Sequence, residues 1–177
     1  MNRLGMLLDI SHLSQAGIDD VLAICDGNIL ASHANARAVC DHPRNLSDDV
    51  IRAIASRNGV VGLSLFSTLI NKEKETATVD DLVDHIDYIA RLVGIDYVAL
   101  GPDFSEFVFG VNAWTGGKGN MEGMQYGSKE HYFHPQLKDW RHLPHITECM
   151  LHRGYTKDEA AKVLGENFLR LYRSAMA

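Results

Sequence analysis

The sequence has few cysteines, no basic block and no long hydrophobic run. Its 177 residues carry three cysteines, four prolines and a formal net charge of −6. Without a basic block, the chain has no electrostatic support for a nucleic-acid partner. No uninterrupted apolar stretch approaches the roughly 18 to 20 residues that a membrane-spanning helix needs, so we expect no membrane insertion. The first residues also do not resemble a signal peptide, because Asp9 and His12 interrupt the apolar segment that follows Met1.

Several familiar motifs are absent as well. Cys25, Cys40 and Cys149 form no CxxC pair and are odd in number, which favours buried thiols in a reducing compartment over a disulfide or a thiolate ligand. We therefore expect a cytoplasmic protein. No GxGxxG or GKS/GKT sequence follows a strand and opens a helix, and there is no GxSxG elbow. The sequence thus indicates neither a phosphate-binding loop nor a serine hydrolase.

Strand-like and helix-like patterns alternate through the first hundred residues. The apolar runs that predict strands are 6–10, 28–32, 60–66 and 97–100. The patterns between and after them predict helices at 14–25, near 35–41, and at 47–57, 79–93, 136–153 and 156–173. Strands separated by helices are typical of βα units and a parallel sheet. With no internal repeat and no linker, residues 1–177 are expected to form one domain.

A long irregular stretch, 105–135, interrupts this alternation. It is rich in glycine and contains Trp114, Tyr126, Tyr132 and Phe133. Such a stretch in a compact domain is usually a functional lid or binding loop, or else disordered. The aromatic content favours a loop that contacts substrate.

Two histidines follow apolar runs of the predicted sheet. His12 comes after 6–10 and His33 after 28–32, and a serine precedes each of them. Strand ends are where α/β proteins place metal ligands and catalytic groups. Imidazole is a common zinc ligand, but a lone histidine at a strand end is as readily a hydrogen-bonded structural residue. The serine before each histidine makes a shared site plausible, and a third polar residue at a strand end, Asp103, makes such a site the favoured interpretation.

Asp103 and Arg44 extend this candidate site. Asp103 ends the fourth predicted strand and supplies an oxygen ligand or a general base. Arg44 follows the second βα turn, where its guanidinium could hold a substrate carboxylate with two hydrogen bonds. From position alone, a surface ion pair is the simpler explanation for Arg44. His85 lies within the predicted helix 79–93, where packing or an ion pair is favoured over metal binding.

A series of segments resembles the successive motifs of the membrane (renal) dipeptidase family. In order, these are DISHLS at 9–14, ASHANARAVC at 31–40, HPRNLSD at 42–48, DHIDYI at 84–89, GPDF at 101–104 and GENFLR at 165–170. The family consists of zinc peptidases on an amidohydrolase-type (β/α) TIM barrel. The resemblance implies that this chain represents about the second half of that barrel, with four parallel strands, their helices and additional C-terminal helices, and hence a partial domain.

The resemblance also implies roles for the candidate residues. His12 and His33 match the histidines that bind one zinc of a two-zinc centre. Arg44 matches the arginine that holds the terminal carboxylate of the dipeptide, and Asp103 matches the strand-end aspartate beside the catalytic water. In such enzymes the metal ions lower the pKa of a water molecule, which attacks the peptide carbonyl. The implied function is therefore zinc-dependent hydrolysis of a dipeptide or a similar small substrate.

The chain departs from the family pattern in two respects. The family's first-strand His-x-Asp pair, its metal-bridging glutamate and a further substrate-binding histidine belong to sequence that precedes this chain. The aspartate–glycine pair that often follows the last strand motif is replaced by Ser105 and Glu106. At most one partial metal site is expected here, so the isolated chain is predicted to be weakly active or inactive.

Three alternatives remain open at this level. A closed eight-stranded barrel typically needs about 250 residues, and four strands leave two unpaired edges. The chain is therefore a dipeptidase fragment complemented by a missing N-terminal half, a homodimer in which two copies close one barrel-like sheet, or a non-catalytic ligand-binding or scaffold module that oligomerises.

Overall fold

The computed structural model describes residues 4–74, 76–104, 136–137 and 139–176. Within them, four strands form one parallel sheet in the order β1-β2-β3-β4. The strands are β1 (Leu8–Asp9), β2 (Ile29–Ala31), β3 (Val60–Leu63) and β4 (Val98–Leu100). The predicted parallel sheet is confirmed, although each strand is shorter than its apolar run. The loop 105–135 lies outside the described residues, and the single domain spanning 1–177 stays a prediction.

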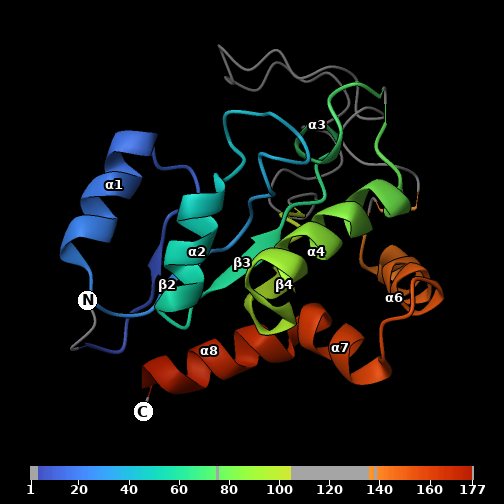
Figure 1. Ribbon diagram of the computed structural model, residues 1–177. Helices are drawn as coiled ribbons and strands as arrows, with labels where there is room; N and C mark the ends of the chain where they lie inside the picture. Colours follow the sequence, from blue (N-terminus) through green and yellow to red (C-terminus); the bar gives the residue numbers. More distant parts are fainter. Residues whose placement is uncertain (1–3, 75, 105–135, 138, 177) are drawn as a thin grey trace, which may run out of the picture.

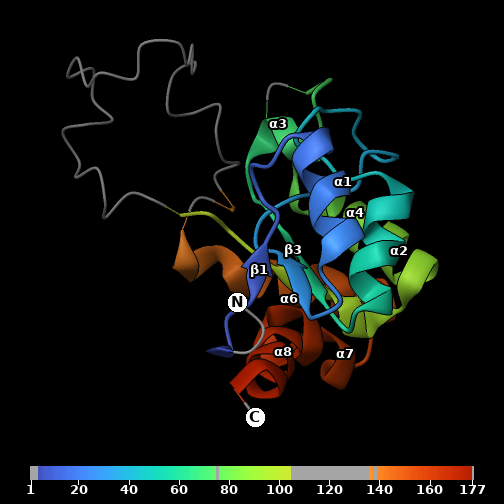
Figure 2. The same cartoon turned by 90° about the vertical axis from the view of Figure 1, so that its left-hand side faces the viewer.

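Helices lie along one face of this sheet and beyond its end (Figures 1 and 2). Those that follow the first three strands are α1 (Gln15–Ile24), α2 (Asp48–Ser56), α3 (Ser67–Ile70) and α4 (Val79–Val93). A short 3-10 helix, Ile95–Tyr97, leads into β4, and another, Trp140–His142, leads into α6 (Leu143–His152). The chain closes with α7 (Lys157–Ala161), a π-helical segment at Lys162–Glu166 and α8 (Asn167–Met176).

The core divides according to the alternation of side chains along the strands. Ile29 and Ala31 of β2 belong to the large apolar cluster that also contains buried residues of α2, α4 and α6. Leu30, between them, belongs to a smaller cluster with Val60 and with Leu171 of α8. Because both faces of the central strands are covered, their sequences are apolar throughout rather than alternating.

The helix predicted near 35–41 is wrong. This segment forms turns, and Ala36 pairs with Leu46 in an isolated parallel bridge. The Asn45 side chain, which is buried, donates to the Cys40 carbonyl at 2.8 Å, and the Arg37 amide donates to the Leu46 carbonyl. Backbone groups that a helix would use for its own hydrogen bonds are therefore bound to Asn45 and Leu46, later in the same loop. These contacts override the helical propensity of the segment.

The C-terminal helices differ from prediction in their boundaries. The helix expected at 136–153 begins with the 3-10 turn, and α6 then starts with Pro144 in its first turn. The helix expected at 156–173 is divided by the π-helical segment and continues to Met176. Buried Asn167, at the start of α8, donates to the carbonyls of Ile95 and Val98, each at 2.8 Å. These two hydrogen bonds fasten α8 to the beginning of β4.

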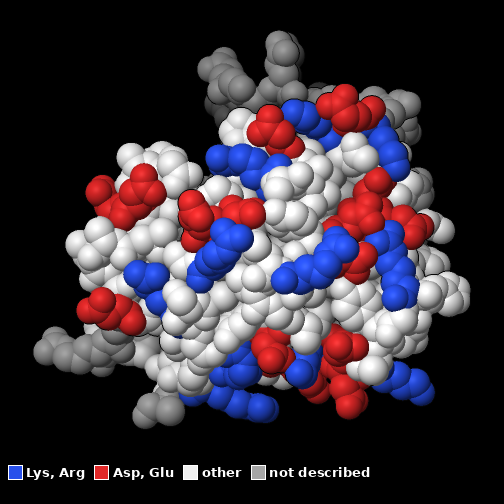
Figure 3. All heavy atoms as spheres, in the orientation of Figure 1, with Lys and Arg blue, Asp and Glu red and all other residues white. Residues whose placement is uncertain are grey.

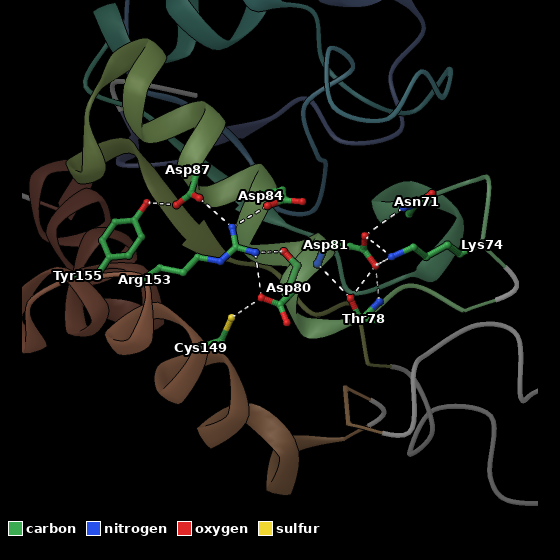
Figure 4. A network of polar contacts seen from close by, with 10 residues as sticks. All are labelled: Asn71, Lys74, Thr78, Asp80, Asp81, Asp84, Asp87, Cys149, Arg153 and Tyr155. Atoms are coloured by element: carbon green, nitrogen blue, oxygen red, sulfur yellow. Dashed lines mark hydrogen bonds and ion pairs between the residues drawn. The ribbon is translucent and has the colours of Figure 1, made fainter.

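Arg153, just after α6, connects this helix to α4 (Figure 4). Its guanidinium donates to carboxylates of Asp84 at 2.6 Å, Asp87 at 2.9 Å and Asp80 at 3.0 Å. Burial lowers the pKa of Arg153, but the hydrogen bonds that it donates to the three carboxylates outweigh burial and raise it. The Tyr155 hydroxyl adds a hydrogen bond to Asp87 at 2.7 Å. We call Arg153 and its three aspartates the Arg153 cluster.

Asp81 occupies the neighbouring part of the same network (Figure 4). It accepts hydrogen bonds from the backbone and hydroxyl groups of Thr78 and from the ammonium of Lys74. Burial raises the pKa of Asp81, but these donors outweigh it and hold the pKa well below its ordinary value. Thr78 with Asp81 and Thr156 with Glu159 form capping boxes at the starts of α4 and α7.

Acidic and basic side chains lie beside one another over the face drawn in Figure 3. Among the described residues, no helix has the length and apolar character required to cross a membrane. Cys25 and Cys40 are buried and Cys149 is half-buried, and no disulfide links these three described residues. The buried thiols expected from the sequence are thus present in two of the three cases.

Candidate active site

His12 and His33 meet at the carboxyl ends of β1 and β2. Their ring centroids are 4.8 Å apart, with the ring planes inclined at 59°. The two parallel strands are paired in register, Leu8 with Ile29 and Asp9 with Leu30, so the segments that follow them leave the sheet together. The structure brings the two predicted ligands together, while their role as metal ligands stays a prediction.

The backbone at the site adopts a conformation that side chains other than glycine rarely take. His12 has φ 69° and Asp103 has φ 58°, both in the left-handed region. For a residue with a Cβ atom, this region costs roughly 1–2 kcal/mol. Such strain persists only where the surroundings impose it, and it is concentrated at functional sites.

Asp9 and two serines hold the His33 segment in place. The Asp9 carboxylate accepts hydrogen bonds from the Ser11 amide at 2.9 Å and from the Ser32 amide at 3.0 Å. The Ser32 hydroxyl lies 2.5 Å from the second carboxylate oxygen and 2.8 Å from Nδ1 of His33. Burial raises the pKa of Asp9, but the hydrogen bonds from Ser32 and Ser11 outweigh it and lower the pKa. The serine that precedes each histidine was the available sequence signal, although it did not identify Asp9.

The other nitrogen of His33 is buried and has no hydrogen-bond partner among the described residues. Buried polar atoms are nearly always satisfied, so an exception calls for a ligand or a functional role. A lone-pair nitrogen beside a second imidazole is a donor set that suits zinc. Within the described part of the chain, however, no three His, Cys, Asp or Glu side chains converge closely enough to hold a metal ion. These residues therefore fit part of a metal site.

The pKa of His12 depends on burial and on the charged groups around it. Burial lowers its pKa, and the positive charge of Arg44 and the neighbouring His33 lower it further. The carboxylates of Asp103 and Asp9 act in the opposite direction but do not outweigh them. A lowered pKa keeps His12 in the neutral form, which is the form that binds a metal.

Arg44 and His12 line the same pocket of about 660 Å³, which also contains Ser11, Ser14 and Asn45. Among the described residues, the Arg44 guanidinium has no ion-pair partner, so the surface ion pair considered from the sequence is not formed there. Its backbone amide donates to Nδ1 of His42 at 3.2 Å. A cationic side chain beside a pocket is thus available for an anionic group.

Polar side chains that sequence reasoning missed, half-buried Arg37 and buried Asn45, support the Arg44 loop. Arg37 donates to the Asn45 and Pro43 carbonyls on either side of Arg44, at 2.9 and 3.2 Å. Asn45 also donates to the Leu69 carbonyl and accepts from the Asn35 amide. Residue type alone does not distinguish these residues from surface polar residues, because their contacts depend on how the loop 35–46 turns back on itself and, for Asn45, on Leu69, 24 residues away.

His85 supports the same loop from α4. Its Nδ1 accepts the Ala36 amide at 3.1 Å, and its Nε2 donates to the Ile70 carbonyl at 2.9 Å. The side chain is fully buried, and burial lowers its pKa. Both ring nitrogens are therefore used for structure, in agreement with the packing role expected from the sequence.

Two glycines allow the strand ends to approach Ser32. A Cβ atom added to Gly62 or to Gly101 would overlap the carbonyl oxygen of Ser32. At Gly62 the added atom would also lie 2.9 Å from the Phe168 ring of α8. The segment that carries His33 can therefore take its position only because residues 62 and 101 have no side chain.

A sequence model of the membrane dipeptidase family, peptidase family M19, matches residues 1–116. The chain belongs to this family. It is 30% identical over 173 residues to dipeptidase tcpJ of Claviceps purpurea, covering 98% of this chain and 35% of that relative. It is 32% identical over 172 residues to dipeptidase aclJ of Aspergillus oryzae, covering 97% of this chain and 35% of the relative. The M19 chain described here therefore spans about a third of the length of these curated relatives.

A solved M19-type structure provides the matching fold. The metallopeptidase of Rhodobacter sphaeroides, liganded with a phosphinate mimic of the dipeptide L-Ala-D-Ala, superposes with a TM-score of 0.78 at 27% identity. The match covers 97% of this chain and 43% of the other. The predicted fold, part of an amidohydrolase-type (β/α) TIM barrel with four parallel strands and C-terminal helices, is confirmed.

Proposed function

We propose that this chain supplies part of the active site of a zinc dipeptidase. His12 and His33 hold one metal ion, Arg44 binds the terminal carboxylate of a dipeptide, and Asp103 accepts the proton of the attacking water. The observation that carries the proposal is the buried Nε2 of His33, which faces no partner among the described residues and lies beside a second imidazole. Membership of the M19 family and the dipeptide mimic held by a similar metallopeptidase support this assignment.

The charge of each side chain determines the role that we propose for it. A bound zinc ion would supply Lewis-acid activation of water and stabilisation of the oxyanion. Arg44 lines the pocket without an ion-pair partner among the described residues, so its guanidinium can bind a carboxylate by two parallel hydrogen bonds. Asp103 is exposed and interacts electrostatically with His12, so its carboxylate can receive a proton near the metal-binding side chains.

Zinc affinity of the full 177-residue chain tests the ligand assignment. Zinc is titrated against a chromophoric competing chelator for the wild type and for His12→Gln and His33→Gln. Each substitution is expected to weaken binding by at least tenfold, because a site with so few protein ligands loses much of its donor set. His152→Gln is the matched control, because His152 is exposed at the end of α6. Unchanged zinc affinity in His12→Gln and His33→Gln would refute the assignment.

Activity of the isolated chain is expected to be weak or absent. Two histidines without a third converging ligand among the described residues cannot form the two-zinc centre that the family resemblance implies. We propose that a partner completes the site, either an N-terminal half of the barrel or a second copy of this chain. Native mass spectrometry distinguishes a homodimer from a monomer, and addition of the N-terminal half of a family member tests complementation. Efficient zinc-dependent turnover by the monomer would contradict the partial-site proposal.

A further inference from the structure

With Asp9 ionised, the two short hydrogen bonds of the Ser32 hydroxyl have only one arrangement of protons, while the Ser11 hydroxyl lies further away at 3.3 Å. The Ser32 hydroxyl has one proton, and its oxygen lies 2.5 Å from Oδ2 of Asp9 and 2.8 Å from Nδ1 of His33. An ionised carboxylate can only accept hydrogen bonds. The hydroxyl therefore donates to Asp9, and the hydrogen bond to His33 must be donated by the imidazole, which places the proton on Nδ1.

The ionised form of Asp9 follows from the groups that surround it. Its Oδ1 accepts the amides of Ser11 and Ser32, and its Oδ2 accepts the Ser32 hydroxyl. Carboxyl groups of aspartate ionise well below neutral pH, and hydrogen bonds from two backbone amides and a hydroxyl stabilise the charged form further, so Asp9 is an ionised acceptor at neutral pH. The chain of contacts thus runs from Asp9 through Ser32 to the ring of His33.

We propose that Asp9 is a positioning residue, which acts through Ser32 to fix His33 in the Nδ1–H tautomer and so leaves the Nε2 lone pair directed at a metal ion. This inference rests on the proposed metal-binding role of His33. Metal-binding histidines commonly donate their second ring N–H to a carboxylate or carbonyl oxygen, which sets the tautomer and the orientation of the ring. Here a serine hydroxyl is interposed, and the buried Nε2 without a partner is the nitrogen that this arrangement leaves unprotonated.

Asp9→Asn makes a distinctive prediction. Its carbonyl oxygen can still accept the two amides, which places the side-chain NH2 group opposite the Ser32 oxygen, where it donates. The Ser32 proton is then free to point at Nδ1 of His33, so the ring changes to the Nε2–H tautomer. Ser32→Ala removes the acceptor for Nδ1–H and is expected to release the same constraint.

Long-range ¹H–¹⁵N NMR spectra of the full chain, labelled at histidine, report the tautomer without any metal. Spectra are recorded at about pH 8, where imidazole side chains are neutral, and the His33 signals are identified by their loss in His33→Gln. We expect Nδ1–H in the wild type and Nε2–H in Asp9→Asn and Ser32→Ala. Asp41→Asn removes the same charge from a residue that lines the pocket of His12 and Arg44 but has no hydrogen bond to Ser32 or His33 among the described residues, and it should leave the His33 tautomer unchanged.

Zinc titration provides the second measurement. Asp9→Asn is expected to weaken zinc binding by about 10–100-fold, with no change in Asp41→Asn. An Nε2–H tautomer in the wild type would overturn the inference, even if a variant failed to fold. So would an unchanged Nδ1–H tautomer in folded Asp9→Asn. If His33→Gln leaves zinc affinity intact while the tautomer still depends on Asp9, the proposed metal site fails and the positioning of the ring by Asp9 stands.

Discussion

Arg153, after α6, contacts three carboxylates, whereas His33, after β2, buries a ring nitrogen that has no partner among the described residues. In the Arg153 cluster one guanidinium bridges three carboxylates and joins two helices. The strand-end site has a left-handed backbone at His12 and Asp103 and an unsatisfied atom at its centre. Departures from ideal structure are expected where function requires them. The comparison therefore separates a region in which polar groups are satisfied from the region to which we assign metal binding.

Arg153→Ala gives the largest expected effect on stability. It would leave the carboxylates of Asp80, Asp84 and Asp87 without their shared guanidinium. Hydrogen bonds to charged groups contribute about 1.5–3 kcal/mol each, and non-additivity within one cluster reduces the total to about 2 kcal/mol. The midpoint of thermal unfolding should fall by about 4–8 °C, as measured by circular dichroism.

Arg52→Ala is the control for this substitution. Arg52 pairs with Asp48 and Asp49 on the surface of α2, with 53% of its side chain exposed. Its loss should cost less than about 0.5 kcal/mol. If the two variants lose equal stability, the Arg153 cluster contributes no more than an ordinary surface pair. Zinc affinity should be unchanged in both folded variants.

His12→Gly and His12→Ala form a pair with a smaller expected difference. Both remove the imidazole, but only glycine adopts the left-handed backbone of this position without steric cost. His12→Gly should therefore be more stable to urea than His12→Ala by about 1 kcal/mol. Equal stabilities would show that the backbone at His12 is not strained in solution, and the contrast between the two regions would weaken.

Acidification is the mildest perturbation, and it acts on His85. Burial lowers the pKa of His85 in the folded chain, so in mild acid the unfolded chain binds a proton that the folded chain does not. This contribution to stability is complete above the ordinary imidazole pKa of about 6.5 and is lost as the pH falls below it. Urea unfolding at several pH values should show the decline.

His85→Gln isolates this effect. The variant should be less stable at neutral pH, because two buried hydrogen bonds are altered, but its stability should depend less on pH below about 6.5 than that of the wild type. If both proteins have the same pH slope, other groups are responsible for the acid sensitivity.

The sequence predicted the parts of the molecule that depend on local pattern. The alternation of apolar runs and amphipathic segments was sufficient for the parallel sheet and for α1, α2 and α4. The position of His12 and His33 after two predicted strands was sufficient to predict that their side chains lie close together. The turn at 35–41 was missed because Asn45 and Leu46 capture its backbone groups from a few residues further along the chain.

The support of the site was harder to predict, because it depends on contacts between distant segments. Asp9 and Ser32 are 23 residues apart, and Ala36 and His85 are 49 apart. A short polar side chain after a strand does not reveal which neighbour it will contact. These residues became identifiable only once the register of β1 against β2 placed Asp9 opposite Leu30 and beside the end of β2.

Gly62 and Gly101 have a consequence for mutational tolerance. Both lie against one carbonyl oxygen, that of Ser32, so any larger residue at either position would displace the segment that carries His33. A saturation screen for zinc binding by the chain should therefore score these two glycines as severely as the histidines. A position in this part of the barrel can therefore be intolerant to substitution for steric reasons as well as for chemical ones. Variants that keep the size of the side chain, such as Asp9→Asn with Asp41→Asn as its control, test the chemical contribution alone.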